Sequence, residues 1–348
     1  MTPSPGRVLV TGATGFLGGW CVIELRRRGH PVRATVRDAG DTERVRAHLR
    51  ALLPQAHLDP ATLDTLEFVT ADLTAEGGWD EAVRECVGVL HVASPFPGRP
   101  PRDPDDLLRP ARDGTIRVLA AADRAGVRRV VVTSSTSAIA YRSGDGPHDE
   151  AQWTDVSHPL GRRAYVRSKT LAERAAWQTA ANLRTELTVI CPGTMLGPPT
   201  TPRLSYSVTP VALMLNGAMP RLPNVGFPVV DVRDIAALHV TALTEPVAAG
   251  QRYAAVAGFR WLADIAAVLR EGLGDHAEKV PTKTMPDPAV RALSLVQPSL
   301  RQILPDLGRE QHFDTTKARR DLDWQPRPLD ETILDCAHGV LTMRQDRP

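Results

Sequence analysis

Val8-Leu-Val-Thr-Gly-Ala-Thr-Gly-Phe-Leu-Gly18 is the stretch that decides the fold of this chain. It begins as a short apolar run typical of a buried strand, and apolar residues continue at helical spacing after its last glycine. Gly12, Gly15 and Gly18 let the chain turn sharply, leave room for a pyrophosphate beside the backbone and allow the helix to pack on the strand. The stretch therefore predicts a strand, a turn and a helix whose N-terminus binds a dinucleotide.

Strand and helix signals alternate through the first half of the chain. The expected strands cover 32–36, 66–70, 88–93, 127–133 and 187–191, and the expected helices include 80–86 and 114–125. This alternation predicts an α/β fold, a Rossmann-like doubly wound parallel sheet. Prolines crowd the chain beyond Pro192, where we expect a smaller, discontinuous C-terminal substrate-binding region to begin. We assign 1–192 to the dinucleotide-binding domain, with 229–257 returning to it, and 193–228 and 258–348 to the substrate-binding region.

Composition limits the function classes. The 348 residues are 42% hydrophobic, enough for a large core, and the net charge of +2 argues against a nucleic-acid or membrane partner. Cys21, Cys86, Cys191 and Cys336 are scattered, which favours buried free thiols over disulfides or a metal site. No signal peptide or long apolar stretch is visible, so we expect a cytoplasmic protein, either a monomer or a homodimer.

Short segments at the ends of several predicted strands contain polar residues. They are Asp72 and Leu73, then Val92, Ala93 and Ser94, then Ser134 and Ser135. Ligands of parallel sheets bind beyond the carboxyl ends of the strands, so these residues should meet at one crevice. The alternative is ordinary capping of loops.

Tyr165 and Lys169 lie one helical turn apart in an expected helix after that crevice. A free phenol has a pKa of about 10, and an ammonium at roughly 5 to 6 Å contributes about 3 kcal/mol at an effective dielectric of about 20. We therefore expect Lys169 to lower the pKa of Tyr165 by about two units. Tyr165 then donates a proton to a carbonyl oxygen as hydride reaches the carbon, and Ser135 hydrogen-bonds the same oxygen.

The end of the second predicted strand carries the choice of nicotinamide cofactor. An acid there usually binds the ribose of NAD, whereas arginine binds the 2′-phosphate of NADP. The strand ends in Val36-Arg37-Asp38, and Arg44 and Arg46 follow on the next helix. Two guanidinium groups suit a phosphate, so we expect NADP(H). Asp38 is the competing signal, and a solvated basic helix start is the alternative.

At these residues the chain resembles the extended short-chain dehydrogenases/reductases, in particular the branch of dihydroflavonol 4-reductases, cinnamoyl-CoA reductases and the carbonyl reductases of yeast and bacteria. The stretches that carry the resemblance are Thr11-Gly-Ala-Thr-Gly-Phe-Leu-Gly18, Arg33-Ala-Thr-Val-Arg-Asp38, His91-Val-Ala-Ser-Pro95, Thr133-Ser-Ser135, Ser168-Lys-Thr-Leu-Ala-Glu173 and Val230-Asp-Val-Arg-Asp-Ile-Ala236. They spread over nearly the full length of the chain.

The resemblance implies a role for each matching residue. Ser135, Tyr165 and Lys169 would be catalytic. The implied cofactor-binding residues are Thr11, Gly12, Gly15, Phe16, Leu17, Gly18, Arg37, Arg44, Asp72, Leu73, Val92, Ala93, Ser94, Thr133, Tyr165, Lys169, Pro192, Gly193 and Thr194. Arg37 and Arg44 would lie at the 2′-phosphate, Asp72 and Leu73 near the adenine, and 192–194 along the nicotinamide. The helical asparagine of a proton relay in many relatives is replaced near Asp113 or Arg117.

The expected activity is the NADPH-dependent reduction of a ketone or aldehyde, without a metal. The expected lid residues are apolar or aromatic and suit an aromatic or medium-chain substrate: Phe96, Ile139, Tyr141, Leu204, Tyr206, Met214 and Phe227. Two alternatives remain open at this point. One is an NAD-dependent sugar-nucleotide epimerase or 3β-hydroxysteroid dehydrogenase of the same fold, and the other is a regulator that senses NADP without turnover.

Overall fold

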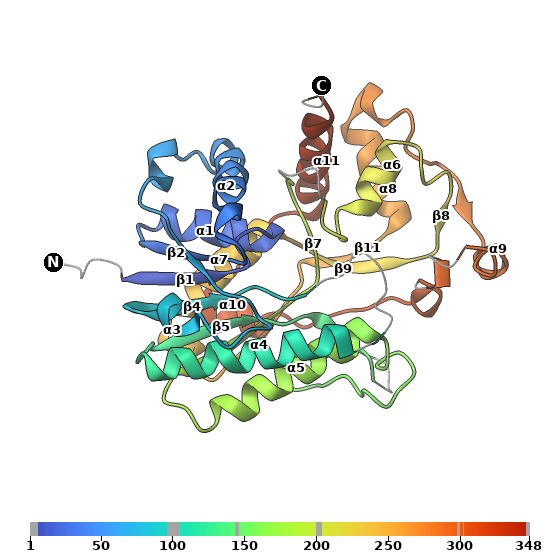
Figure 1. The fold of residues 1–348 in the computed structure, drawn as a ribbon. Coiled ribbons are helices and arrows are strands. Elements are labelled where there is room, and N and C mark those ends of the chain that lie inside the picture. The colour runs from blue at the N-terminus through green and yellow to red at the C-terminus, as the bar shows by residue number, and fades with distance from the viewer. Residues whose placement is uncertain are drawn as a thin grey trace.

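A seven-stranded parallel sheet forms the centre of the protein, as the alternation predicts (Figure 1). The computed structural model describes residues 6–95, 103, 105–142, 146–199, 204–297, 300–301 and 303–345. Along the sheet the strands are β10 (Arg252–Ala255), β6 (Glu186–Pro192), β5 (Arg129–Thr133), β4 (Cys86–His91), β1 (Arg7–Thr11), β2 (Val32–Val36) and β3 (Glu67–Thr70). Every pair in it is parallel. The chain therefore has the expected doubly wound α/β fold.

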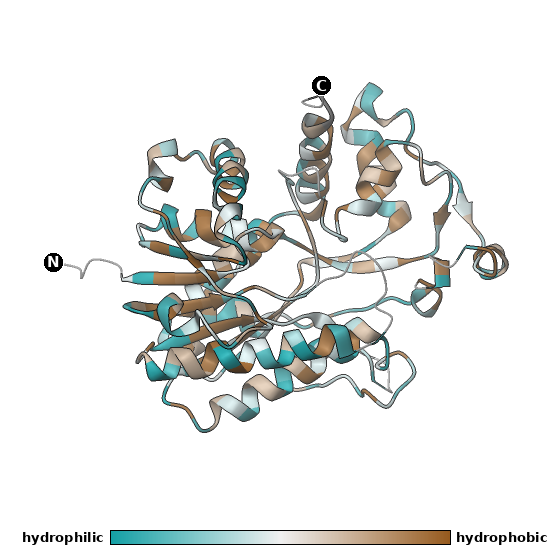
Figure 2. Ribbon diagram, viewed as in Figure 1, coloured by the Kyte–Doolittle hydropathy of each residue, from teal (hydrophilic) through white to brown (hydrophobic). Residues whose placement is uncertain are grey.

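Helices cover both faces of this sheet. One face carries α1 (Phe16–Arg27), α2 (Thr42–Ala56) and α7 (Val232–Thr244), and the other carries α3 (Trp79–Val83), α4 (Asp105–Arg124) and α5 (Ala164–Ala180). Alternation along β1 divides the two cores, because Val8 and Val10 pack with the first set and Leu9 with the second. Figure 2 shows the strands as a mostly hydrophobic layer between the helices.

Some predicted boundaries differ from the structure. Helix α4 begins at Asp105 rather than at 114 and contains Pro110. A proline inside a helix removes a hydrogen bond, so sequence reasoning stops a helix there, whereas packing of α4 against α5 keeps this one continuous. Strand β4 ends at His91, which leaves Val92, Ala93 and Ser94 in the loop beyond it.

Two smaller sheets and their helices form a second layer. In one, β9 (Gly226–Asp231) pairs with β7 (Thr194–Leu196) and with β11 (Gly258–Trp261), and in the other β12 (Thr284–Met285) pairs with β8 (Leu222–Pro223). The helices of this part are α6 (Thr209–Leu215), α8 (Leu262–Gly272), α9 (Asp287–Leu293) and α11 (Leu329–Gln345), whereas α10 (Thr316–Leu322) packs on the main core through Ala318 and Leu322. Apolar residues of α6, α8 and α11 share a separate core with these strands.

The stretch 230–236 joins the two layers through buried charges. The Asp231 carboxylate accepts from the Arg233 backbone N–H at 2.7 Å, which begins α7, and from the Arg233 guanidinium. Arg233 also reaches Asp335 of α11 at 2.7 Å. Asp234 pairs with Arg327, just before α11. These contacts give the stretch a structural role, which is to hold α11 against α7.

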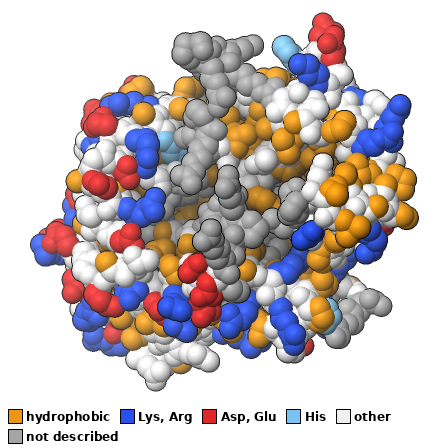
Figure 3. Space-filling view, turned by 45° about the vertical axis from the view of Figure 1, so that its right-hand side comes forward, with side chains coloured by type: hydrophobic (Ala, Val, Ile, Leu, Met, Phe, Trp, Pro, Cys, Tyr) orange, Lys and Arg blue, Asp and Glu red, His pale blue; other side chains and the backbone are white. Residues whose placement is uncertain are grey.

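All four cysteines are free and buried, as expected. Among the described residues, no helix is both long enough and apolar enough to cross a membrane. Basic and acidic side chains intersperse on the face that Figure 3 shows, and hydrophobic side chains gather around its centre and right side. Leu295 and Val296, just beyond α9, are each 75% exposed.

Candidate active site

The glycine turn between β1 and α1 brings two backbone segments into contact. Gly12 has a φ of +76°, and its carbonyl accepts from the Gly15 N–H at 2.9 Å. A Cβ on Gly18 would lie 2.0 Å from the Gly12 oxygen, so only glycine allows this approach. Gly15 precedes α1 and offers no capping side chain, which leaves first-turn N–H groups for an anion. The turn therefore fits a dinucleotide pyrophosphate.

The side chains around this turn are mostly used inside the protein. Leu17 is buried in the core, and Phe16 packs against both the main core and the second one. The buried Thr11 hydroxyl lies 2.9 Å from His91 Nδ1 and accepts from the Ala93 N–H at 3.0 Å. Residues 11, 16 and 17 thus shape the turn, while the backbone faces the expected cofactor.

The bonds of His91 fix its tautomer. Thr115 donates its hydroxyl proton to the Ala111 carbonyl at 2.7 Å, so at 3.1 Å it accepts from His91 Nε2–H. His91 Nδ1 then accepts from the Thr11 hydroxyl. Burial, with a further contribution from the charge of Lys169, lowers the pKa of His91 to about 3, so the ring is neutral. This chain of bonds ties β1, β4 and α4 together at the edge of the crevice.

Arg37 and Arg44 lie at the exposed end of the candidate cofactor site. Arg37 is exposed beyond β2, and its charge helps to lower the pKa of Asp72, although the larger cause is hydrogen bonding from Thr74. The Arg44 side chain is 67% exposed and lies 3.0 Å from Asp41. Asp38, the competing NAD signal, accepts from the Gly40 N–H at 2.8 Å and so caps a turn.

Arg46 does not lie with Arg37 and Arg44 at the exposed end of the candidate cofactor site. Its guanidinium donates to the carbonyls of Leu63 and Leu66 at 3.1 and 3.2 Å and stacks on Phe68. The expectation that it belongs to a phosphate-binding group is therefore wrong, because helix α2 turns it toward the loop before β3.

Leu73, which we expect near the adenine, packs against Gly114 of α4.

Three consecutive hydroxyl groups at the end of β5 each have a different partner. Thr133 Oγ1 lies 2.8 Å from His239 Nε2, and His239 Nδ1 donates to the Ile235 carbonyl at 2.8 Å, so Thr133 is the donor to the ring. Ser134 donates to the Glu173 carboxylate at 2.5 Å. Ser135 hydrogen-bonds the Tyr165 phenol and accepts from the Ser137 N–H.

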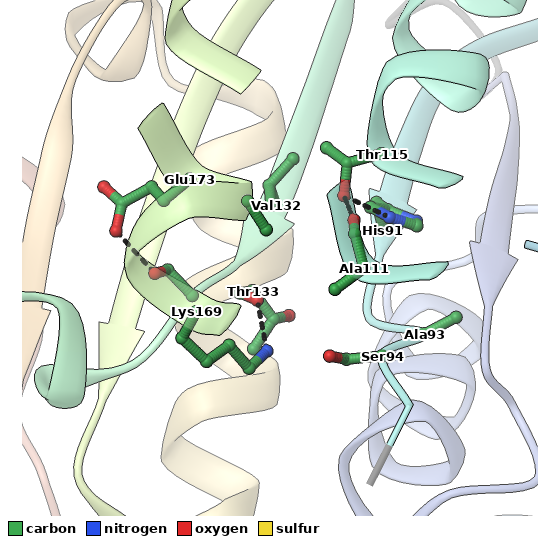
Figure 4. A pocket seen from close by; sticks show the side chains of 11 residues that line it. His91, Ala93, Ser94, Ala111, Thr115, Val132, Thr133, Lys169 and Glu173 are labelled. Atoms are coloured by element: carbon green, nitrogen blue, oxygen red, sulfur yellow. Dashed lines mark hydrogen bonds between the residues drawn. The ribbon is translucent and has the colours of Figure 1, made fainter. Parts of the chain in front are cut away.

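Lys169 lies beside the same strand end (Figure 4). Its Nζ donates to the Thr133 carbonyl at 3.2 Å and borders a cavity of about 20 Å³, which His91, Ser94 and Thr115 also line. Burial lowers the pKa of Lys169 to about 8, while Cys191 and Glu173 act in the opposite direction. The group is therefore mostly an ammonium at neutral pH.

The pKa of Tyr165 differs from the expectation. Desolvation raises it above the usual value and Tyr141 adds to this, whereas the hydrogen bond with Ser135 lowers it. The expected net lowering by Lys169 is therefore wrong, because the cost of burying a phenolate exceeds the stabilisation that its neighbours give. The phenol is protonated at neutral pH, the state that a proton donor requires.

Pro192, Gly193 and Thr194 continue from β6 into β7. The Gly193 N–H donates to the Ala255 carbonyl at 3.1 Å, and a Cβ on Gly193 would lie 2.5 Å from the Pro228 oxygen. The glycine therefore lets β6, β9 and β10 converge beside the crevice.

Parts of the expected lid and relay lie elsewhere. Ile139 is fully buried in the core under α4 and Met214 in the core under α8, so both side chains pack inside the protein and expose no surface. Phe96 lies outside the described residues. Leu204 and Phe227 pack partly exposed on the second core, and electrostatic contacts link Tyr141 and Tyr206 to an Arg163–Asp306 ion pair.

The two suggested relay positions on α4 bind other partners, and Arg117 also donates to the Leu73 carbonyl at 2.8 Å. Asp113 accepts from Arg112 at 2.7 Å, and Arg117 pairs with Glu76 at 2.6 Å. Helix α4 instead presents Ala111 and Thr115 to the cavity beside Lys169 (Figure 4).

Sequence reasoning missed three buried residues that border the site, namely His239, Glu173 and Arg252. Glu173 stands in a stretch that carried the family resemblance, one turn beyond Lys169, and that spacing was the available signal. His239 and Arg252 come from α7 and β10, far along the chain, and no local pattern marks them.

Residues 8–257 match the NAD dependent epimerase/dehydratase family. The chain belongs to that family. The cinnamoyl-CoA reductase CAD2 of Medicago truncatula is 37% identical over 271 residues, which cover 76% of this chain and 80% of that protein. A dihydroflavonol 4-reductase of Zea mays is 34% identical over 275 residues, covering 76% of this chain and 74% of the relative.

The solved structures agree in fold. Yeast methylglyoxal/isovaleraldehyde reductase Gre2, solved with NADPH, has a TM-score of 0.77 at 22% identity and covers 98% of this chain and 100% of its own. The resemblance to the reductase branch of the extended short-chain dehydrogenases/reductases is thus confirmed.

Proposed function

We propose that the protein is an NADP-dependent oxidoreductase that reduces a ketone or aldehyde to an alcohol, with Tyr165 as the proton donor. The hydrogen bond between Ser135 and Tyr165 at the end of β5 is the observation that carries this proposal. Lys169 lies one turn along α5 and donates to the neighbouring Thr133 carbonyl. A hydroxyl, a phenol and an ammonium thus converge beyond the carboxyl edge of the sheet, where parallel sheets bind ligands.

The residues present suit NADPH. The glycine turn and the start of α1 would hold the pyrophosphate, and Arg37 and Arg44 the 2′-phosphate. Asp72 and Leu73 would border the adenine, and 192–194 the nicotinamide. When bound, the reduced nicotinamide supplies the hydride. Residues 1–192, with 229–257, would bind the cofactor, while 193–228 and 258–348 would bind the substrate.

The proton moves between groups of this chain and the substrate. Tyr165, whose pKa is raised, donates its phenolic proton to the carbonyl oxygen as negative charge develops there. Ser135 hydrogen-bonds the same oxygen and orients it. Lys169, as an ammonium, stabilises the phenolate that results and would also hold the nicotinamide ribose.

The substrate that we propose is an aromatic or medium-chain carbonyl compound. The names of the relatives include cinnamoyl-CoA and dihydroflavonol, both of which contain aromatic rings. Tyr141, Leu204, Tyr206 and Phe227 would provide the apolar and aromatic surface for such a substrate. We expect the enzyme to act in the cytoplasm as a monomer or homodimer.

A panel of ketones and aldehydes, followed by the absorbance of NADPH, tests the proposal. We expect oxidation of NADPH with at least one aromatic or medium-chain member and far less with NADH. Tight binding of NADPH without turnover across the panel would contradict it and favour a regulator. Purified protein that retains NAD through a whole catalytic cycle would instead favour an epimerase.

A further inference from the structure

A buried ion pair lies one turn beyond Lys169 on α5. Glu173 is 2% exposed and Arg252, from β10, is 6% exposed. Glu173 Oε1 accepts from Arg252 Nε at 2.5 Å, and Oε2 accepts from Arg252 Nη2 at 3.1 Å and from the Ser134 hydroxyl at 2.5 Å. Both carboxylate oxygens are thus bound, which fixes the side chain.

Arg252 is held from its other side as well. Its Nη1 donates to the carbonyls of Glu150 and Gln152 at 3.0 and 2.6 Å, and its guanidinium stacks on Trp153 at 3.9 Å. The position of Glu173 is therefore set by β10 and the loop at 150–153 as well as by Trp177 of its own helix, whose Nε1 donates to Glu173 Oε1 at 3.2 Å.

Ser134 connects this pair to the proposed catalytic groups. It stands between Thr133, whose carbonyl accepts from Lys169, and Ser135, whose hydroxyl bonds Tyr165. A shift of Ser134 would move both neighbours. Figure 4 shows Glu173 and Lys169 projecting from the same helix beside this strand end.

We infer that Glu173 is a positioning residue of the proposed reductase. Through Ser134 it fixes the end of β5, and its carboxylate, although paired with Arg252, also favours the charged form of Lys169. This inference rests on the proposed function. The titratable groups that act on Lys169 or border it are His91 from β4, Cys191 from β6 and Glu173 from α5, and the charged Arg252 of β10 pairs with Glu173. His91 and Cys191 are buried and neutral at pH 7, so Glu173 is the negative charge among these.

Glu173→Gln and Ser134→Ala separate the two roles. The first removes the charge, leaves Arg252 positive and should move the alkaline limb of the kcat–pH profile, which reports Lys169, down by about one pH unit. The second keeps the charge, so it should lower kcat roughly tenfold without moving that limb. Glu173→Asp, which keeps the charge on a shorter side chain, should restore the limb to its wild-type position.

Glu186→Gln is the matched control, because it breaks another pair with a buried arginine, Arg129, at 2.7 Å and at the amino ends of β5 and β6, away from the carboxyl ends that carry the proposed site. It should lower the thermal midpoint and leave the pH profile unchanged. If Glu173→Gln does not fold, Glu173→Gln/Arg252→Gln removes both charges and should shift the limb in the same direction by a smaller amount, because no uncompensated positive charge remains.

The inference would be overturned if the alkaline limb of the kcat–pH profile in Glu173→Gln coincided with that of the wild type. It would also be overturned if Glu186→Gln shifted this limb by the same amount. Failure of the reductase proposal looks different, because the wild type would then oxidise no NADPH. The pH dependence of NADPH binding, followed by nucleotide fluorescence, would still report Lys169 in that case.

Discussion

The two ends of the proposed cofactor site differ in how their polar groups are held. At the end of β5, Thr133, Ser134 and Ser135 each bond a partner from a different helix or helix turn, and the surrounding groups are mostly buried. At the end of β2, Arg37 and Arg44 are exposed, and Arg44 pairs with a neighbour on its own turn. Buried groups act from fixed positions, whereas exposed charges move and are screened by salt. The largest effects should therefore arise at β5.

Tyr165→Phe should have the largest effect. Removing a positioned proton donor typically costs about 10²- to 10⁴-fold in kcat, and binding of NADPH should stay close to that of the wild type. Steady-state rates and a fluorescence titration of the nucleotide measure both. Tyr253→Phe, which removes a phenol that bonds Asp321, is the control and should keep its rate. Wild-type turnover in Tyr165→Phe would remove the proposed acid.

Arg37→Ala tests the exposed end. Loss of a charged hydrogen bond to the 2′-phosphate should raise the KM for NADPH by roughly 10- to 100-fold and leave the KM for NADH nearly unchanged. The effect should shrink at high salt, unlike that of Tyr165→Phe. Equal losses for both cofactors would show that Arg37 does not select NADP.

The buried end should also respond to acid. Burial lowers the pKa of His91 to about 3 and of His239 to about 4. The unfolded state then binds more protons below about pH 6.5, so stability is retained above that pH and lost as the pH falls toward 4. Urea unfolding at pH 6.5 and pH 5 should differ by on the order of 1.5 kcal/mol for each histidine.

His239→Gln should reduce the difference in unfolding free energy between pH 6.5 and pH 5 by the part that His239 contributes. His338→Gln, which changes an exposed residue of α11, should leave it as in the wild type. An unaltered pH dependence in His239→Gln would show that the ring is already protonated in the folded protein.

Arg44→Ala should have the smallest effect, about two- to threefold on the KM for NADPH, because its side chain is largely solvated and shares its charge with Asp41. Arg46→Ala is the comparison. It should lower the thermal midpoint, because Arg46 donates hydrogen bonds to the backbone carbonyls of Leu63 and Leu66. The preference for NADPH should stay unchanged. A large loss of NADPH affinity in Arg46→Ala would contradict the division between the two residues.

Sequence reasoning could predict features that depend on neighbours along the chain. The strand at 7–11, the glycine turn and the start of α1 follow from the spacing of apolar residues and from glycines whose need for space is local. The parallel sheet with helices on both faces followed from the alternation of elements, whereas the order of its strands came from the structure. The convergence of Ser135, Tyr165 and Lys169 followed from their places at a strand end and on one helix face.

By itself, then, the sequence determined the doubly wound sheet and its glycine turn, and it indicated the residues that we propose to react. Only the tertiary structure decided how those groups are held and charged. Glu173 meets Arg252 from 79 residues away, Arg46 turns from the phosphate end to a loop, and Ile139 and Met214 enter the cores. The direction of the Tyr165 pKa changed for the same reason, because desolvation depends on every segment packed around the phenol and no local spacing records it.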